Sequence, residues 1–168
     1  MGMRNSSSFG ITLERVSVPK DYDFQMNEIK NHFDYGVFHI PFQSFARLCM
    51  AASYLGVVHC LAQHCLEKLR KPEVISIIKD KLEPLLFASE KSLYITAKYV
   101  EKLSFAGEYS NIEEEKIRKD LGNKNLEIFN LVQELFLAGG LPFIEEDNII
   151  HWAYRDVLTA VQHFMVKP

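Results

Sequence analysis

The sequence has little excess charge of either sign. Its 19 Lys and Arg residues are nearly balanced by 22 Asp and Glu residues, which gives a net charge of −3 over 168 residues. So small a charge provides no electrostatic reason to expect binding to nucleic acid or to an anionic membrane. No uninterrupted apolar run reaches the ~18 residues that a membrane span needs, and the first ten residues lack the apolar core of a secretory signal. We therefore expect a cytoplasmic protein.

Cysteine is scarce, with only Cys49, Cys60 and Cys65. An odd number in a chain without an export signal predicts reduced thiols. The spacings of 11 and 5 residues match no zinc-binding pattern. All three lie in an apolar stretch, so we expect them to be buried and structural, as small apolar side chains.

The sequence also lacks the short motifs of several enzyme classes. It contains no GxSxG nucleophile elbow, no P-loop and no glycine-rich dinucleotide motif. None of its six histidines lies four residues from another or forms an ExxH pair, the spacings that helical metal sites use. We therefore predict no metal site.

Apolar residues recur with the period of an α-helix through most of the chain. The pattern predicts four helices, over residues 40–70, 73–104, 111–138 and 148–166. Because the connections between them are short, we predict an all-α, up-down-up-down four-helix bundle. Pro84 predicts a kink near residues 80–83 or a break into two pieces. Ser110 and Glu113 match a capping box at the start of the third helix.

The N-terminal quarter differs from the rest. Residues 11–18 alternate apolar and polar side chains, which predicts a short extended strand that Pro19 ends. We divide the chain into an extended segment and connector at 1–36 and a helical domain at 37–168.

The first predicted helix is apolar on more than one face, as expected of a central helix packed on several sides. Gly56 inside it costs ~1 kcal/mol relative to Ala, which close packing of another element could justify. The last helix adds Trp152, Phe164 and Met165. This much apolar surface exceeds what a lone bundle can cover, so we predict a homodimer or homotetramer formed through the helices.

Three places could carry chemistry, and each has a structural alternative. Arg47 begins an otherwise apolar helix, where it could equally be an exposed residue with a snorkelling stem. Gly139–Gly140 ends the third helix, where a simple C-cap would suffice. Asp156 and His163 stand two turns apart with Thr159 between them, which is also the pattern of a polar outer face.

From about Ile11 onward the chain resembles the C-terminal part of the acyl-CoA dehydrogenase superfamily. ITLERVSVP is similar to that family's last middle-domain strand, and FARLCMAASYLGVVHCLAQHCLE to its first bundle helix. LFLAGG, a loop and YRD resemble its GG-loop-RD stretch. RDVLTAVQH is most similar to the type-2 branch, which includes flavin-dependent monooxygenases.

The resemblance implies the C-terminal four-helix domain of a flavoprotein oxidoreductase, with residues 1–36 as the remnant of a middle β domain. Arg47 matches an arginine that contacts the phosphates of FAD or FMN across a subunit interface. Gly139 and Gly140 match glycines that let the backbone approach the cofactor. His163 matches a histidine near the flavin's reactive edge, where it could donate a hydrogen bond or take a proton. The domain would help to close the flavin site around an acyl-CoA or aromatic substrate.

The sequence also departs from the family. Phe164 stands near the place of the glutamate that dehydrogenases commonly carry in the last helix, and Ala46 replaces the alternative glutamate in the first. Trp152 stands where the type-2 branch usually has an arginine. Because family members are more than twice as long, we expect no bound flavin and no turnover by this chain alone. These losses support a second hypothesis, a non-catalytic helical interaction module derived from the family.

Overall fold

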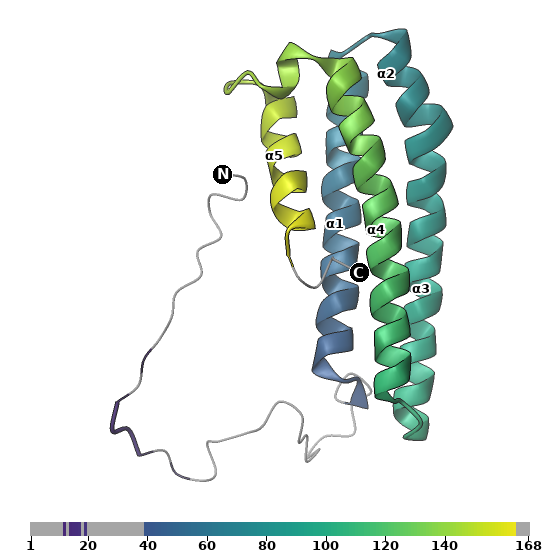
Figure 1. The fold of residues 1–168 in the computed structure, drawn as a ribbon, viewed down its shortest axis with the longest axis vertical. Coiled ribbons are helices and arrows are strands. Elements are labelled where there is room, and N and C mark those ends of the chain that lie inside the picture. The colour runs from purple at the N-terminus through teal and green to yellow at the C-terminus, as the bar shows by residue number, and fades with distance from the viewer. Residues whose placement is uncertain (1–11, 13, 18, 20–38, 164–168) are drawn as a thin grey trace.

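The computed structural model describes residues 12, 14–17, 19 and 39–163. Within them the fold is all-helical, with no strand. The elements are α1 (Phe42–Lys68), α2 (Pro72–Ser76), the π-helical segment η3 (Ile77–Leu82), α3 (Glu83–Ala106), α4 (Asn111–Gly139), the 3-10 turn η4 (Leu141–Phe143) and α5 (Ile149–Val161). Because α2, η3 and α3 follow one another without a break, the described chain has four helical units, which lie side by side (Figure 1).

Two predictions fall at the ends of the described residues. Ile11, Leu13 and Val18, which carry the prediction of a strand, lie outside them, and residues 12 and 14–17 form no strand. The prediction that the last helix reaches residue 166 is wrong, because α5 ends at Val161. The next two amides donate to carbonyls three residues back, at 3.2 and 3.1 Å, and this tightening ends the helix.

Pro84 produces the predicted irregularity as a widened turn. The Glu83 amide donates to the carbonyl of Ile78, five residues back, which is the π-helical pattern. A proline in a regular helix would clash with the carbonyl four residues before it. The π-helical segment η3 ends at Leu82, two residues before Pro84, and the helix continues as α3 from Glu83.

Side-chain caps fix where the later helices begin. The Ser110 hydroxyl accepts from the Glu113 amide at 3.4 Å and starts α4 as predicted. The Asn148 side chain accepts from the Ile150 amide at 3.0 Å and starts α5. Gly107 ends α3 with a φ of 69°, a left-handed conformation that glycine adopts without strain.

Helix α1 packs against α2, α3, α4 and α5, so it is the central helix, as predicted. Two buried clusters line it. The larger runs from Tyr54 to Leu69 on α1 and includes apolar side chains from the other helices; the smaller lies at the start of α1. The members of the smaller cluster are Ala51, Val100, Ile117 and Leu121.

The outward side of α1 differs from what we expected. Cys65 is buried, but Cys49 and Cys60 are exposed, so the prediction that they are buried is wrong. A Cβ at Gly56 would meet nothing within 4 Å in the part of the chain that the structure describes, so no close packing among those residues explains this glycine. Apolar character on this helix therefore extends beyond what the chain itself covers.

By length and composition α1 is also the one helix among the described residues that could cross a membrane. This is weak evidence for a span, because the core helix of a soluble protein satisfies the same criteria. Helix α1 contacts the other four α-helices, and 39% of its most apolar window is buried inside the chain.

Candidate functional site

Arg47 lies in the second turn of α1 and is only 4% exposed, so the alternative of an exposed, snorkelling arginine is wrong. Beside it the hydroxyl groups of Ser44 and Tyr109 share a hydrogen bond of 2.5 Å. Burial lowers the pKa of the Arg47 guanidinium, and the nearby charge of Arg118 lowers it further. Glu114 opposes this shift. The guanidinium is therefore enclosed by α1, Tyr109 and the first turns of α4.

The charge of Arg118 is balanced on its own helix. Its Nε and Nη2 atoms donate to Glu115 at 2.9 and 2.7 Å, and this pairing lowers the pKa of Glu115 to about 2. Arg47 and Arg118 together could attract an anion such as a phosphate. With Arg47 almost fully covered, a phosphate could reach it only after α1 and α4 move apart.

Gly139 is required by packing inside the chain. A Cβ on this residue would lie 2.1 Å from Cε2 of Phe143, which no side chain could accept without movement. Phe143 is itself buried and forms edge-on contacts with Phe136 and Tyr154. The space beside Gly139 is therefore filled by an aromatic side chain of η4.

Gly140 ends α4 with a φ of 75°, a conformation that favours glycine. The Lys71 ammonium donates to the carbonyls of Ala138 and Gly139 at 3.3 and 2.8 Å. A cation at this position satisfies terminal carbonyls and complements the negative end of the helix dipole. The C-cap alternative for the glycine pair thus has direct structural support. In the sequence Lys71 comes just after α1, and no sequence signal indicates that it caps α4.

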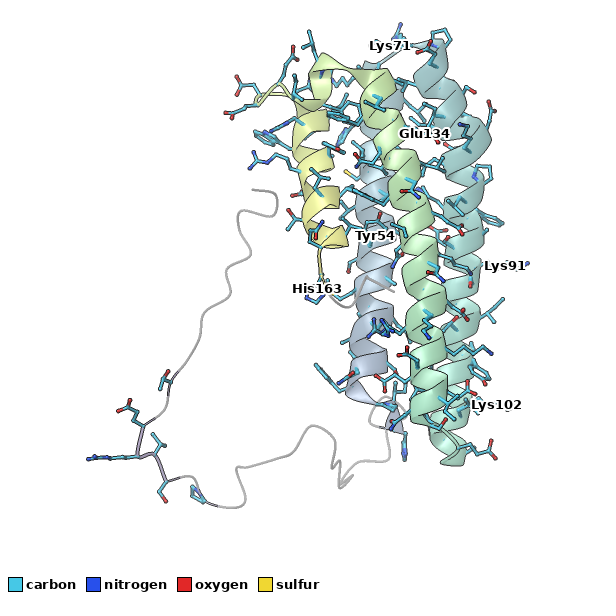
Figure 2. The ribbon with its side chains drawn as sticks, viewed as in Figure 1. Tyr54, Lys71, Lys91, Lys102, Glu134 and His163 are labelled. Atoms are coloured by element: carbon cyan, nitrogen blue, oxygen red, sulfur yellow. The ribbon has the colours of Figure 1, made fainter. Side chains whose placement is uncertain are left out.

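His163 lies two residues beyond the end of α5 and is exposed (Figure 2). The helix that was predicted to hold Asp156 and His163 two turns apart therefore ends before His163. Thr159 does donate to a backbone carbonyl, that of Arg155, at 2.9 Å, as its position between the two residues suggested.

His151, which the sequence analysis did not select, has two defined hydrogen-bond partners. His151 Nδ1 lies 2.8 Å from the carbonyl oxygen of Phe143, so this nitrogen carries a proton and donates it. Nε2 can then accept from Arg155 Nη1 at 3.4 Å. The first interaction anchors α5 to η4, and the second lies within α5. The spacing of four residues between His151 and Arg155 is a sequence signal for the second interaction alone.

The predicted residues do not form one site within this chain. Gly139 lies against Leu69, just after the end of α1, whereas Arg47 lies near its start. Arg47 and Leu69 are 22 positions apart in the sequence, which corresponds to a separation of about 33 Å along a helix. Arg47 is covered, Phe143 fills the space at Gly139, and His163 is on the surface. These observations do not fit a flavin held by this chain alone.

No group of three or more His, Cys, Asp or Glu side chains that could hold a metal ion occurs among the described residues. Comparison of the chain with models of protein families gives no match, and comparison with curated proteins gives none either. The resemblance to acyl-CoA dehydrogenases therefore depends on the sequence motifs alone.

Proposed function

We propose that this chain is a helical interaction module derived from the C-terminal domain of acyl-CoA dehydrogenase-like flavoproteins, and that its role is assembly. The observation that carries the proposal is that the motif residues pack inside the fold or end a helix. Arg47 is buried between α1 and α4, and Gly139 and Gly140 accommodate Phe143 and end α4. Residues that would approach a cofactor in the family stabilise the fold here.

The up-down-up-down arrangement of the helices is part of the proposal. The connections at residues 69–71, 107–110 and 140–148 support it, because short connections join antiparallel neighbours. The packing of α1 against α3, α4 and α5 also fits such a bundle.

In this proposal copies of the chain assemble through the outward side of α1. Between Cys49 and Cys60 most of the exposed residues of α1 are small. They follow one another at the spacing of helical turns, so they lie along one side of the helix. We call this surface the α1 face; its residues are Cys49, Ala52, Ser53, Gly56 and Cys60. Small side chains allow two helices to approach closely. We propose a homodimer or homotetramer, located in the cytoplasm, where the two exposed thiols stay reduced.

The test is to purify the tagged protein from its source cells, then measure its mass by light scattering and its absorbance spectrum. The module predicts a colourless homodimer or homotetramer. A yellow protein with a flavin spectrum would contradict the module, and so would a monomer at tens of micromolar. Recovery in the membrane fraction would contradict the cytoplasmic location.

A second candidate is the flavoprotein domain itself, as part of a longer oxidoreductase that holds FAD or FMN. The order of the motif regions on α1, α4 and α5 favours it. In this candidate His163 acts as a hydrogen-bond donor or base. His163→Ala in a flavin-containing form should then lower turnover by roughly 10²–10⁴-fold and leave flavin content nearly unchanged. His59→Ala is the matched control on an exposed histidine of α1. Equal loss of folding and turnover in the His163 variant would contradict the catalytic role.

A further inference from the structure

The outward side of α3 carries exposed aromatic side chains in line with lysines. Phe87, Tyr94 and Phe105 are each more than half exposed. Their spacings of 7 and 11 residues place them on one side of the helix. Three exposed lysines lie along the same side. We call this surface the α3 stripe; its residues are Phe87, Lys91, Tyr94, Lys98, Lys102 and Phe105.

Two of the three lysines of the α3 stripe carry positive charge that no described carboxylate neutralises. Among the described residues, no carboxylate lies within ion-pair distance of Lys91 or Lys102, which project from the outer side of α3 (Figure 2). Lys98 lies 6.0 Å from the centre of the Tyr94 ring and 3.3 Å from Glu101. A second flanking carboxylate, Glu90, pairs with His59 of α1 at 2.8 Å. The stripe is therefore aromatic along its centre and basic on one flank.

A second uncovered surface surrounds the connection between α4 and α5. Four large apolar side chains there are each more than half exposed, and three exposed carboxylates lie in the loop between them. We call this surface the α4–α5 corner; its residues are Leu137, Leu141, Ile144, Glu145, Glu146, Asp147 and Trp152. Two cations on neighbouring elements have other partners. Lys71 donates to the carbonyl of Gly139, and Arg155 donates to His151.

The α4–α5 corner has a defined shape. The Trp152 indole donates to the carbonyl oxygen of Glu146 at 2.5 Å, and the Asn148 amide side chain donates to the Glu145 carboxylate at 3.4 Å. The Asn148 backbone amide donates to the Glu145 carbonyl at 3.0 Å. A pre-ordered surface loses little conformational entropy when a partner binds it.

The two surfaces lie on opposite sides of the molecule, since α5 and α3 are the outermost helices on either side of α1 and α4 (Figure 1). One chain therefore cannot bring its own stripe and corner together. One surface is aromatic and basic, and the other is apolar and acidic. We propose that the α3 stripe of one copy of this chain binds the α4–α5 corner of a second copy.

Such a contact joins two different patches, so each bound copy still presents one stripe and one corner to further copies. It is separate from the α1 face and does not depend on the proposed function. We favour a second copy over an anionic membrane because the α4–α5 corner offers ordered apolar side chains to the aromatic residues as well as carboxylates to the lysines.

The experiment reverses the charges of each surface. One variant carries Lys91→Glu, Lys98→Glu and Lys102→Glu, and the other carries Glu145→Lys, Glu146→Lys and Asp147→Lys. Each variant alone places like charges on both surfaces, so association measured by sedimentation at low salt should weaken roughly tenfold or more. An equimolar mixture of the two variants restores opposite charges between copies and should associate as the wild type does.

Carbodiimide cross-linking of wild-type protein should join the stripe lysines of one isotopically labelled copy to the corner carboxylates of an unlabelled one. Reversal of Lys68, Lys116 and Lys119, which lie outside both surfaces, is the matched control and should leave association unchanged. Three results would each overturn the proposal: single variants that associate like wild type, a mixture that does not recover, or binding of wild type to phosphatidylserine vesicles without self-association.

Discussion

At the scale of single residues, the glycines of this chain have different roles that the sequence does not distinguish. Gly139 is in a position where a methyl group has no space, whereas Gly56 faces open space. The same residue type is thus required by packing in one helix and free of any contact within the chain in another.

We predict that Gly139→Ala lowers the free energy of unfolding by roughly 1–3 kcal/mol, because its Cβ would overlap Phe143 and force a shift of the buried ring. Gly56→Ala is the control and should be neutral or stabilising by up to about 1 kcal/mol, since Ala favours the helix. Urea denaturation of both variants measures the difference. Equal effects would show that Phe143 moves aside freely.

The three thiols should also differ in reactivity. Burial raises the pKa of the Cys65 thiol to about 12, so at pH 8 in the folded protein it stays protonated and shielded. Cys49 and Cys60 are exposed. In dilute protein, where copies that meet at the α1 face are separated, we expect iodoacetamide to label these two quickly at pH 8. Cys65 should be labelled only after denaturation, as mapped by mass spectrometry. Labelling of all three at similar rates in the native protein would contradict the burial of Cys65.

At the scale of elements, helix boundaries depend on local chemistry that can be read in the sequence. Ser110 caps α4 and Pro84 follows a π-helical segment, both near the places the sequence indicated. The end of α5 could not be read in the same way, because apolar residues continue past the turn at 162–163.

Removal of the α4 cap tests this element directly. Ser110→Ala leaves the Glu113 amide without its side-chain acceptor and should cost about 1 kcal/mol of unfolding free energy. Ser110→Asp keeps an acceptor and adds a favourable charge at the helix start, so it should be close to wild type. Thermal and urea unfolding of the pair give the answer, and equal losses in both would argue against capping.

At the scale of the whole molecule, the uncovered α1 face predicts self-association that a single bulky side chain should prevent. Gly56→Leu adds a large side chain where the chain itself has nothing within 4 Å, so the fold should be retained. The same side chain would separate two copies that meet at this surface. At high salt, which weakens the charge-dependent contact between the α3 stripe and the α4–α5 corner, light scattering at tens of micromolar should then show a monomer for Gly56→Leu and an oligomer for Gly56→Ala. An unchanged oligomer with unchanged helicity would exclude the α1 face as the contact.

Helical periodicity, Pro84 and Ser110 allowed the four helical units and the central position of α1 to be predicted from the sequence. These features depend on interactions between residues close in the sequence, or on how apolar a helix is. Both properties can be read directly from the sequence. The same reasoning located the Gly139–Gly140 helix end and the backbone hydrogen bond of Thr159.

The positions of Arg47, Cys49 and Cys60 relative to solvent were decided only by the tertiary structure. So were the pairing of Lys71 with the end of α4 and the contact of Phe143 with Gly139. Each of these depends on which side of a helix meets another helix far away in the sequence. Periodicity defines a helix face but not its partner. For this reason the sequence could suggest a set of flavin-binding residues, but packing between helices decided where they lie. Within this chain Arg47 is covered, Phe143 fills the space beside Gly139, and the two positions lie far apart.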